Sequence, residues 1–232
     1  MNEQRVPAKG QPVSDPRRRE AKGAQSLRDA AYEAIKHRII TCAFRPGEYL
    51  NEAFVSASLG IGRTPVHQAI DRLMLEGMVD VMPRKGVIVK PVSLDEIMQI
   101  VDVRLINEIF GIRLAAERAE QDEIKHLSDI LARAAQWIDA RNSEQLMLLD
   151  REFHNVLALA SKNHVLADTL SKLHDRSLRF WFISLNRPGH HAHVHAQHEA
   201  ILAAIRDHDP NGAEQAMRSH IEEFRNNLTR SM

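Results

Sequence analysis

The sequence predicts a mostly α-helical protein in two parts: a winged helix-turn-helix of three helices plus a β-hairpin wing, then an antiparallel bundle of about six helices. Between residues 45 and 91, helix caps, turn residues and short apolar runs follow in the order of two short helices and a hairpin. From residue 94 onward the apolar spacing is helical, without a convincing strand. A chain of 232 residues, 44% hydrophobic, is long enough for both parts.

The first helix is expected from Ser26 to about Thr41, because Ser26 and Asp29 form a capping box. Its buried face is expected to carry Leu27, Ala31, Ile35 and Ile39. Residues 1–24 contain three prolines and three consecutive arginines, which predicts a disordered basic arm able to add non-specific phosphate contacts. The expected parts of the chain are therefore a disordered arm at 1–24, a winged helix-turn-helix domain at 25–91 and a helical domain at 92–232.

The second and third helices are predicted by their caps. Asn51 can cap the second helix, and Gly60 supplies the left-handed residue that ends it. Thr64 is expected to cap the third helix, with Pro65 at its first position and Gly77 after its end. The apolar residues on these helices are Phe54, Val55 and Leu59, then an inward stripe of Val66, Ile70, Leu73 and Met74.

The segment after the third helix predicts a wing with a basic tip. Val79 and Val81 alternate with polar residues, 83–86 forms a turn, and 87–89 returns as a strand. The third helix exposes arginine and glutamine near its start, which suit guanine and adenine edges in a major groove. These features predict binding to double-stranded DNA, with candidate contacts at Arg63, Thr64, His67, Gln68, Arg72, Arg84, Lys85 and Gly86.

Charge and composition agree with this interpretation. The net charge is zero, but residues 1–91 hold 15 basic against 10 acidic residues, whereas 92–232 hold 16 against 21. Cys42 is the only cysteine, so neither an internal disulfide nor a cysteine-based zinc site is available, and a reducing cytoplasm is expected. No apolar run approaches the ~18 residues of a membrane span, so no membrane association is expected.

Six helices are predicted after the wing. Ser93 and Glu96 form a second capping box, and Asp209 with Pro210 is typical of the start of the last helix. The expected helices lie near 94–119, 122–140, 144–161, 164–185, 192–208 and 210–229.

The bundle sequence places a carboxylate and three imidazoles on apolar helix faces, at Asp150, His154, His198 and His220. A single histidine on such a face is more often a hydrogen-bonded core residue than a metal ligand. Burying all four groups without compensation would cost several kcal/mol. The set therefore predicts a divalent metal ion, zinc first, with nickel, manganese or iron also suited. The histidines between residues 190 and 195 are a competing metal-binding tract or a loop, and His164, His174 and His208 are expected at the surface or at helix ends.

Two stretches of the sequence resemble known families. The run from Pro46 to Val89 resembles the DNA-binding segment of GntR-family repressors. It departs at Gly62, His67 and Gln68, where the family usually has Ser, Arg and Glu, so the family's usual operator is not implied.

The second stretch, LDREFHNVLALASKNHVL from Leu149 to Leu166, resembles the FadR-type ligand-binding domain known as FCD. In the metal-containing, VanR-like branch of that family the residues that match Asp150, His154, His198 and His220 hold the ion. Arg104 stands where the family usually has an arginine that binds a ligand carboxylate. Asn163 lies in the matching segment from Leu149 to Leu166. The resemblance implies that both residues contact the effector.

The predicted function is that of a non-enzymatic, homodimeric transcriptional repressor, released from a palindromic operator by a small carboxylate effector bound at the metal. One alternative keeps the DNA binding and makes the metal purely structural. Another is a metal-dependent hydrolase, which the absence of any nucleophile motif or phosphate-binding loop disfavours. The third, an acyl-CoA sensor like the metal-free branch, is disfavoured by the intact Asp/His set.

Overall fold

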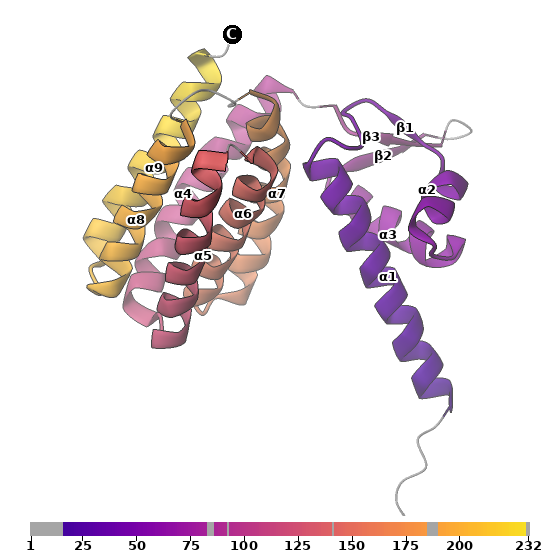
Figure 1. Ribbon diagram of the computed structural model, residues 1–232, viewed down its shortest axis with the longest axis horizontal. Coiled ribbons are helices and arrows are strands. Elements are labelled where there is room, and N and C mark those ends of the chain that lie inside the picture. Colours follow the sequence, from indigo (N-terminus) through magenta and orange to yellow (C-terminus); the bar gives the residue numbers. More distant parts are fainter. Residues whose placement is uncertain (1–15, 83–85, 92, 141, 185–189, 231–232) are drawn as a thin grey trace, which may run out of the picture.

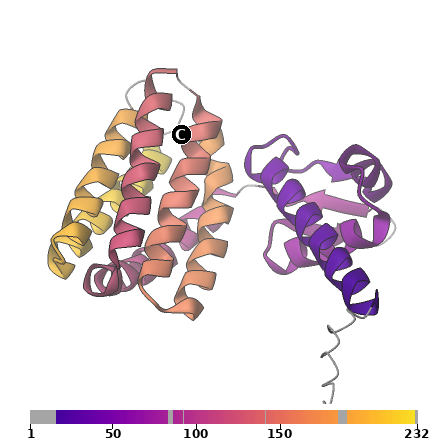
Figure 2. The same ribbon diagram turned by 60° about the horizontal axis from the view of Figure 1, so that its bottom comes forward.

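The computed structural model describes residues 16–82, 86–91, 93–140, 142–184 and 190–230. Two lobes lie side by side, an N-terminal lobe with a small sheet and a C-terminal helical bundle (Figures 1 and 2). This is the predicted fold class. The N-terminal lobe contains α1 (Pro16–Ile40), β1 (Tyr49–Leu50), α2 (Glu52–Leu59), α3 (Arg63–Leu75), β2 (Val79–Met82) and β3 (Gly86–Val89).

The helix-turn-helix forms around the predicted turn residues, with one correction. Asn51 Oδ1 accepts hydrogen bonds from the amides of Ala53 and Phe54, at 2.9 and 3.2 Å, and Gly60 ends α2 with a left-handed φ of 64°. Thr64 is not the cap of α3. That helix already begins at Arg63, after Gly62, and no side chain caps it.

The wing is a three-stranded sheet rather than the expected two-stranded hairpin. Its order is β1-β3-β2, with Val79 opposite Val89 and Tyr49 opposite Ile88 in antiparallel register. The additional strand β1 has two residues, too few for an alternating pattern to reveal. The expected basic tip, with Arg84 and Lys85, lies outside the described residues.

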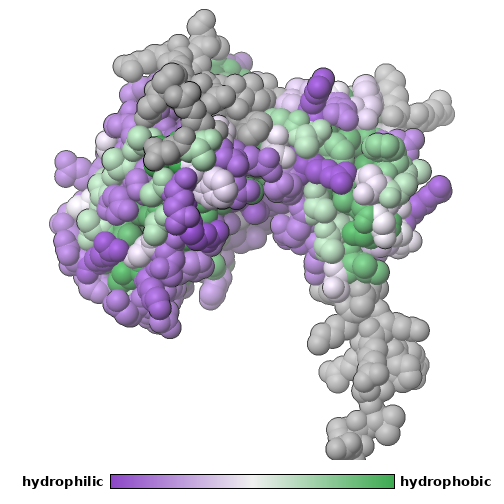
Figure 3. Space-filling model, in the orientation of Figure 1, coloured by the Kyte–Doolittle hydropathy of each residue, from purple (hydrophilic) through white to green (hydrophobic). Residues whose placement is uncertain are grey.

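Two apolar residues expected to be buried, Leu27 and Met74, are exposed instead. The helix α1 begins at Pro16 rather than at Ser26, and Figure 1 shows its first turns projecting past α3. Leu27 is therefore 50% exposed, because no other element covers that part of α1. Phe54 and Met74 are 67% and 39% exposed, since α2 and α3 bury only the sides that carry Val55 and Leu73. Apolar patches also interrupt the hydrophilic surface of this lobe in Figure 3.

The described part of the bundle contains the six expected helices. They are α4 (Leu94–Arg118), α5 (Gln121–Ala140), α6 (Ser143–Ala160), α7 (His164–Ser184), α8 (His190–Arg206) and α9 (Pro210–Arg230). Each boundary lies within two residues of its predicted position, because caps and apolar period coincide at most of these ends. Asp209 accepts a hydrogen bond from the amide of Asn211, as expected at the start of α9.

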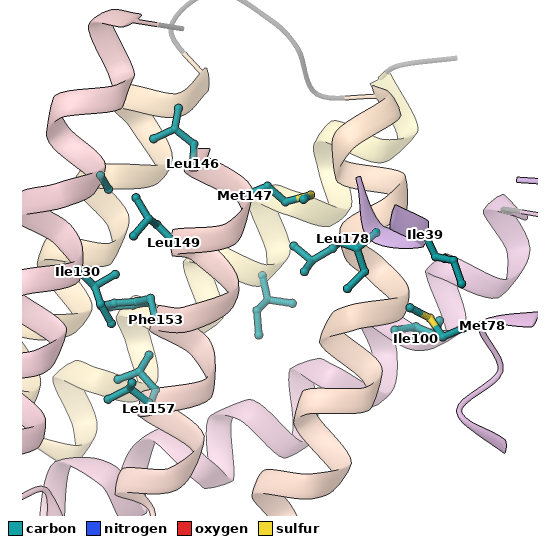
Figure 4. Packing of buried hydrophobic residues seen from close by; sticks show 14 of the residues in the cluster. Ile39, Met78, Ile100, Ile130, Leu146, Met147, Leu149, Phe153, Leu157 and Leu178 are labelled. Atoms are coloured by element: carbon teal, nitrogen blue, oxygen red, sulfur yellow. The ribbon is translucent and has the colours of Figure 1, made fainter. Parts of the chain in front are cut away.

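The hydrophobic core is continuous between the two lobes. Figure 4 shows Ile39 and Met78 of the N-terminal lobe close to Ile100 and Leu178 of the bundle, and all four belong to one cluster of buried residues. Phe153 lies at the centre of the bundle and is fully buried. None of the described helices combines the length and the apolar character that crossing a bilayer requires. The orientation of the lobes is thus supported by apolar packing.

Candidate metal centre and DNA-binding face

The four predicted ligands converge inside the bundle. Asp150 and His154 come from one face of α6, His198 from α8 and His220 from α9. The three imidazoles are 4–8% exposed, and one nitrogen from each lies within 4.8 Å of the others. Asp150 Oδ1 lies 3.5 Å from Nε2 of His198 and 4.0 Å from Nε2 of His154. The structure thus brings the four side chains together in the interior of the bundle.

Two of the nitrogens that face this position are buried and lack hydrogen-bond partners among the described residues. They are Nε2 of His154 and Nε2 of His198. Because a buried polar atom without a partner costs about 1–3 kcal/mol, such atoms are uncommon in folded proteins. A divalent cation would satisfy both, so the donor set present here fits a metal ion.

Neighbouring side chains orient the ligand rings. Glu108 Oε2 lies 3.1 Å from His154 Nδ1, and Gln197 Oε1 lies 2.9 Å from His220 Nδ1. A carboxylate can only accept, so Nδ1 of His154 carries a proton, and in the neutral ring this leaves a lone pair on Nε2. Histidines that bind a metal usually donate their other ring N–H to such an acceptor. Glu108 is a site residue that the sequence prediction missed, although it lies four residues after Arg104 on the same helix face.

His174 is a correction, because it was expected at the surface or at a helix end. It is 5% exposed, its Nε2 lies 3.1 Å from Asp150 Oδ2, and its ring stacks on His154 at 4.5 Å between centroids. The signal that could have found it is the stripe it shares with Leu170 and Leu178, four residues to either side, both buried. His164 and His208 are exposed near helix ends, as expected.

The electrostatics keep the cluster in its cation-binding form. Burial lowers the pKa of His198 to about 3 and that of His174 to about 4, and it also lowers the pKa of His220. Burial alone would raise the pKa of Asp150, but the hydrogen bond to His174 and the nearby imidazoles hold it well below its usual range. Near neutral pH these histidines are therefore neutral and Asp150 is ionised, which is the protonation that metal ligands require.

A small cavity adjoins the cluster, and the predicted arginine is part of its lining. Arg104 is 4% exposed; its Nε donates to Glu108 Oε1 at 2.6 Å, and its Nη1 donates to Ser177 Oγ at 3.0 Å. The guanidinium thus points inward as expected, but part of it is already engaged. Other residues that line the cavity are Leu178, His190, His193, Gln197, Ile221 and Phe224.

Asn163 does not join this cavity, contrary to expectation. Its side-chain oxygen accepts a hydrogen bond from the amide of Leu166 at 3.1 Å, so it caps the start of α7 at the junction with α6. One histidine of the tract at the start of α8 forms a contact beside the cavity. His193 Nε2 lies 2.7 Å from Glu223 Oε2, which joins α8 to α9 beside the cavity.

The start of α3 presents four of the eight predicted DNA-binding residues to solvent. Arg63, Thr64, His67 and Gln68 are exposed. His67 lies 3.2 Å from the Glu52 carboxylate, and this hydrogen bond raises the pKa of His67. Gly86 begins β3 with a φ of 93°, which glycine adopts readily at the turn of the wing.

Arg72 is a correction among the DNA-binding candidates. Its guanidinium lies 3.6 Å from the centroid of the Tyr32 ring, and its Nε donates to Glu76 at 3.3 Å. These contacts hold α3 against α1. Although Arg72 lies on α3, its side chain stabilises the lobe and is turned away from the exposed start of that helix.

An exposed helix-turn-helix with a wing, joined to a bundle that contains a cavity, defines a DNA-binding regulator of transcription. Comparison with known families agrees. Residues 27–89 match the bacterial regulatory proteins of the gntR family, and residues 99–223 match the FCD domain. The chain belongs to the GntR family of transcriptional regulators and carries an FCD domain, the FadR-type arrangement.

Relatives and solved structures support the assignment along most of the chain. The Nta operon transcriptional regulator of Aminobacter aminovorans is 33% identical over 155 residues, covering 66% of this chain and 73% of that protein. The HTH-type transcriptional repressor RspR of Escherichia coli K12 is 24% identical over 200 residues, covering 86% and 88%. The structure of E. coli McbR/YncC superposes with a TM-score of 0.80 at 21% identity, covering 88% and 97%, which shows a shared fold.

Proposed function

We propose that this regulator is a repressor that leaves a palindromic operator when a small organic acid binds beside a metal ion in the bundle. The observation that carries the proposal is the convergence of Asp150, His154, His198 and His220, with two buried imidazole nitrogens lacking partners. A regulator needs a site whose occupancy changes, and this cluster adjoins a cavity lined by Arg104.

The four side chains would hold the ion. Three neutral imidazoles and one carboxylate suit zinc best, and they also suit nickel, manganese or iron. When bound, a divalent cation supplies a Lewis-acidic position that attracts an anionic oxygen of the effector. Glu108 and Gln197 keep two of the imidazoles in the required orientation.

The cavity favours a small carboxylate as the effector. Arg104 offers the guanidinium donors that Glu108 and Ser177 leave free, and arginine binds carboxylates through paired hydrogen bonds. Ile221 and Phe224 give the same cavity an apolar wall. A ligand with a carboxylate at one end and a short apolar body therefore matches the lining.

Operator binding requires two copies of the chain, because a palindrome presents two half-sites related by two-fold symmetry. An exposed apolar stripe on α4 is available for the contact between copies. Val103, Ile106 and Phe110 lie on neighbouring turns and are 45%, 72% and 53% exposed. We therefore propose a homodimer with α4 at its interface.

The proposal is tested by metal analysis of the purified protein, combined with thermal unfolding in the presence of small carboxylic acids. Zinc should raise the melting temperature, and an effector acid should raise it further only when zinc is present. His154→Ala should abolish both shifts, whereas His164→Ala, at an exposed position of α7, should leave both unchanged. Stabilisation by zinc with no response to any carboxylate, and no effect of carboxylates on DNA affinity, would identify the metal as purely structural.

A further inference from the structure

Two adjacent residues of α7 contact different parts of the protein. His174 faces the metal-ligand cluster, where its Nε2 lies 3.1 Å from Asp150 Oδ2. Asp175 is 1% exposed and faces the N-terminal lobe, where it forms an ion pair with Lys36 of α1. One turn further on, Arg179 Nη1 donates to the backbone oxygen of Lys90, at the start of the connection between the lobes. The helix thus contacts both the candidate site and the DNA-binding lobe.

The contact with the N-terminal lobe is a buried network of charges. Lys36 is 4% exposed, and its Nζ lies 3.1 Å from Glu76 Oε2 and 2.6 Å from Tyr32 Oη. Tyr32 Oη in turn donates to Glu76 at 2.7 Å. Arg151 of α6 completes the network by donating to Asp175 Oδ1 at 2.5 Å. We call these five residues the interdomain network.

The network joins α7 to the helices that position the DNA-binding surface. Glu76 directly follows α3, the helix whose start carries Arg63 and Gln68, and Lys36 lies on α1, which packs along α3. Separating a buried ammonium from its carboxylate partners leaves charges uncompensated in a poorly solvated region. A displacement of α7 is therefore accommodated more readily by moving α1 and α3 with it than by opening the network.

We propose that α7 couples the metal-ligand cluster to the DNA-binding lobe, with His174 as its contact on one side and the Lys36–Asp175 ion pair as its contact on the other. This inference rests on the proposed metal site and specifies how its occupancy reaches α3. Binding at the cluster restrains Asp150 and, through it, His174. The restraint passes along one helix to Asp175, and from there to α1 and α3.

The test is amide hydrogen exchange of the full chain with and without zinc ion alone. In the wild type, zinc should slow exchange in α6–α9 and also in the segments of α1 and α3 next to Lys36 and Glu76. The expected slowing in α1 is about 5-fold or more, the lower end of typical coupling between sites. A variant with Lys36→Met and Asp175→Leu replaces the ion pair by apolar side chains, so it keeps the contact without the charges. In this variant zinc should protect the bundle alone.

Two further variants keep the result interpretable. Lys36→Arg retains the charge and should retain the protection of α1, even if the double variant folds poorly. Lys162→Met removes an exposed ion pair with Glu123 and should change nothing. Protection of α1 in the double variant equal to wild type would overturn the coupling, as would a wild type in which zinc protects only the bundle; both leave the metal site standing. Zinc that protects no segment would overturn the metal site and the coupling together.

Discussion

Glu108 joins Arg104 to His154, a candidate metal ligand, and removing its carboxylate should affect both stability and zinc affinity. Its Oε1 accepts from Arg104 Nε at 2.6 Å, and its Oε2 lies 3.1 Å from His154 Nδ1, with 6% of the residue exposed. Burial alone would raise the pKa of Glu108, but the Arg104 guanidinium holds it well below its usual range, so the carboxylate is ionised.

The change Glu108→Leu leaves the Arg104 charge buried without its partner. Breaking such a pair costs about 3–5 kcal/mol, so the free energy of unfolding in urea should fall by roughly that amount. His154 also loses the acceptor that fixes its ring, which should weaken zinc binding about 10- to 100-fold. The two effects are measured by urea unfolding followed by circular dichroism and by zinc competition with a chromophoric chelator.

A second variant separates the two effects. Combining Arg104→Met with Glu108→Leu removes both charges and should restore most of the unfolding free energy, while zinc affinity stays low because His154 Nδ1 still lacks its acceptor. The matched control is Asp102→Asn on the same helix, which breaks an exposed ion pair with Arg225 and should cost less than about 1 kcal/mol. If the folded Glu108→Leu protein binds zinc as tightly as wild type, Glu108 does not position His154 and the reasoning is refuted.

Three further predictions concern DNA binding and assembly. Arg63→Ala should weaken binding to a selected operator duplex by about 1–3 kcal/mol in a titration, whereas Arg72→Ala should chiefly lower the melting temperature, since its guanidinium packs on Tyr32. The raised pKa of His67 means that its charge, and the stabilising pair with Glu52, are fully present below the unfolded-state pKa and are lost as pH rises through the folded-state pKa. Operator affinity should therefore fall from about pH 6 to about pH 8 in wild type and stay level in His67→Gln. Finally, Ile106→Lys should shift the protein toward monomer in light scattering, because it charges the apolar stripe of α4.

The helices and the buried positions of the candidate metal ligands were predictable because they depend on local signals. A helix end is determined by a cap and a turn residue within a few positions, as at Asn51 and Gly60. A stripe of apolar residues fixes which face of a helix is buried, so His154, His198 and His220 could be placed inside before any contact was known. Which buried faces meet depends on how the helices pack, and the structure brings these three imidazoles together.

Two residues near the site were mispredicted, for different reasons. Asn163 caps α7, a local role that its place directly before that helix could have indicated. His174 looked peripheral because its partner Asp150 lies on a different helix. Nothing in a single sequence pairs two such positions, whereas a full count of the 170–174–178 spacing would have shown that His174 is buried.

The errors also gather where the lobes meet. Glu96 was assigned to a capping box with Ser93, but Ser93 makes no side-chain cap bond, and Glu96 instead forms an ion pair with Arg176 of α7. Arg72 was assigned to DNA, but it lies against Tyr32, a member of the interdomain network. In both cases a charged side chain that local rules would place in solvent has a partner on another element. Because local rules assume solvent around such groups, their failures here mark the surfaces where α1, α3, α4 and α7 depend on one another, which is where a signal from the bundle has to pass.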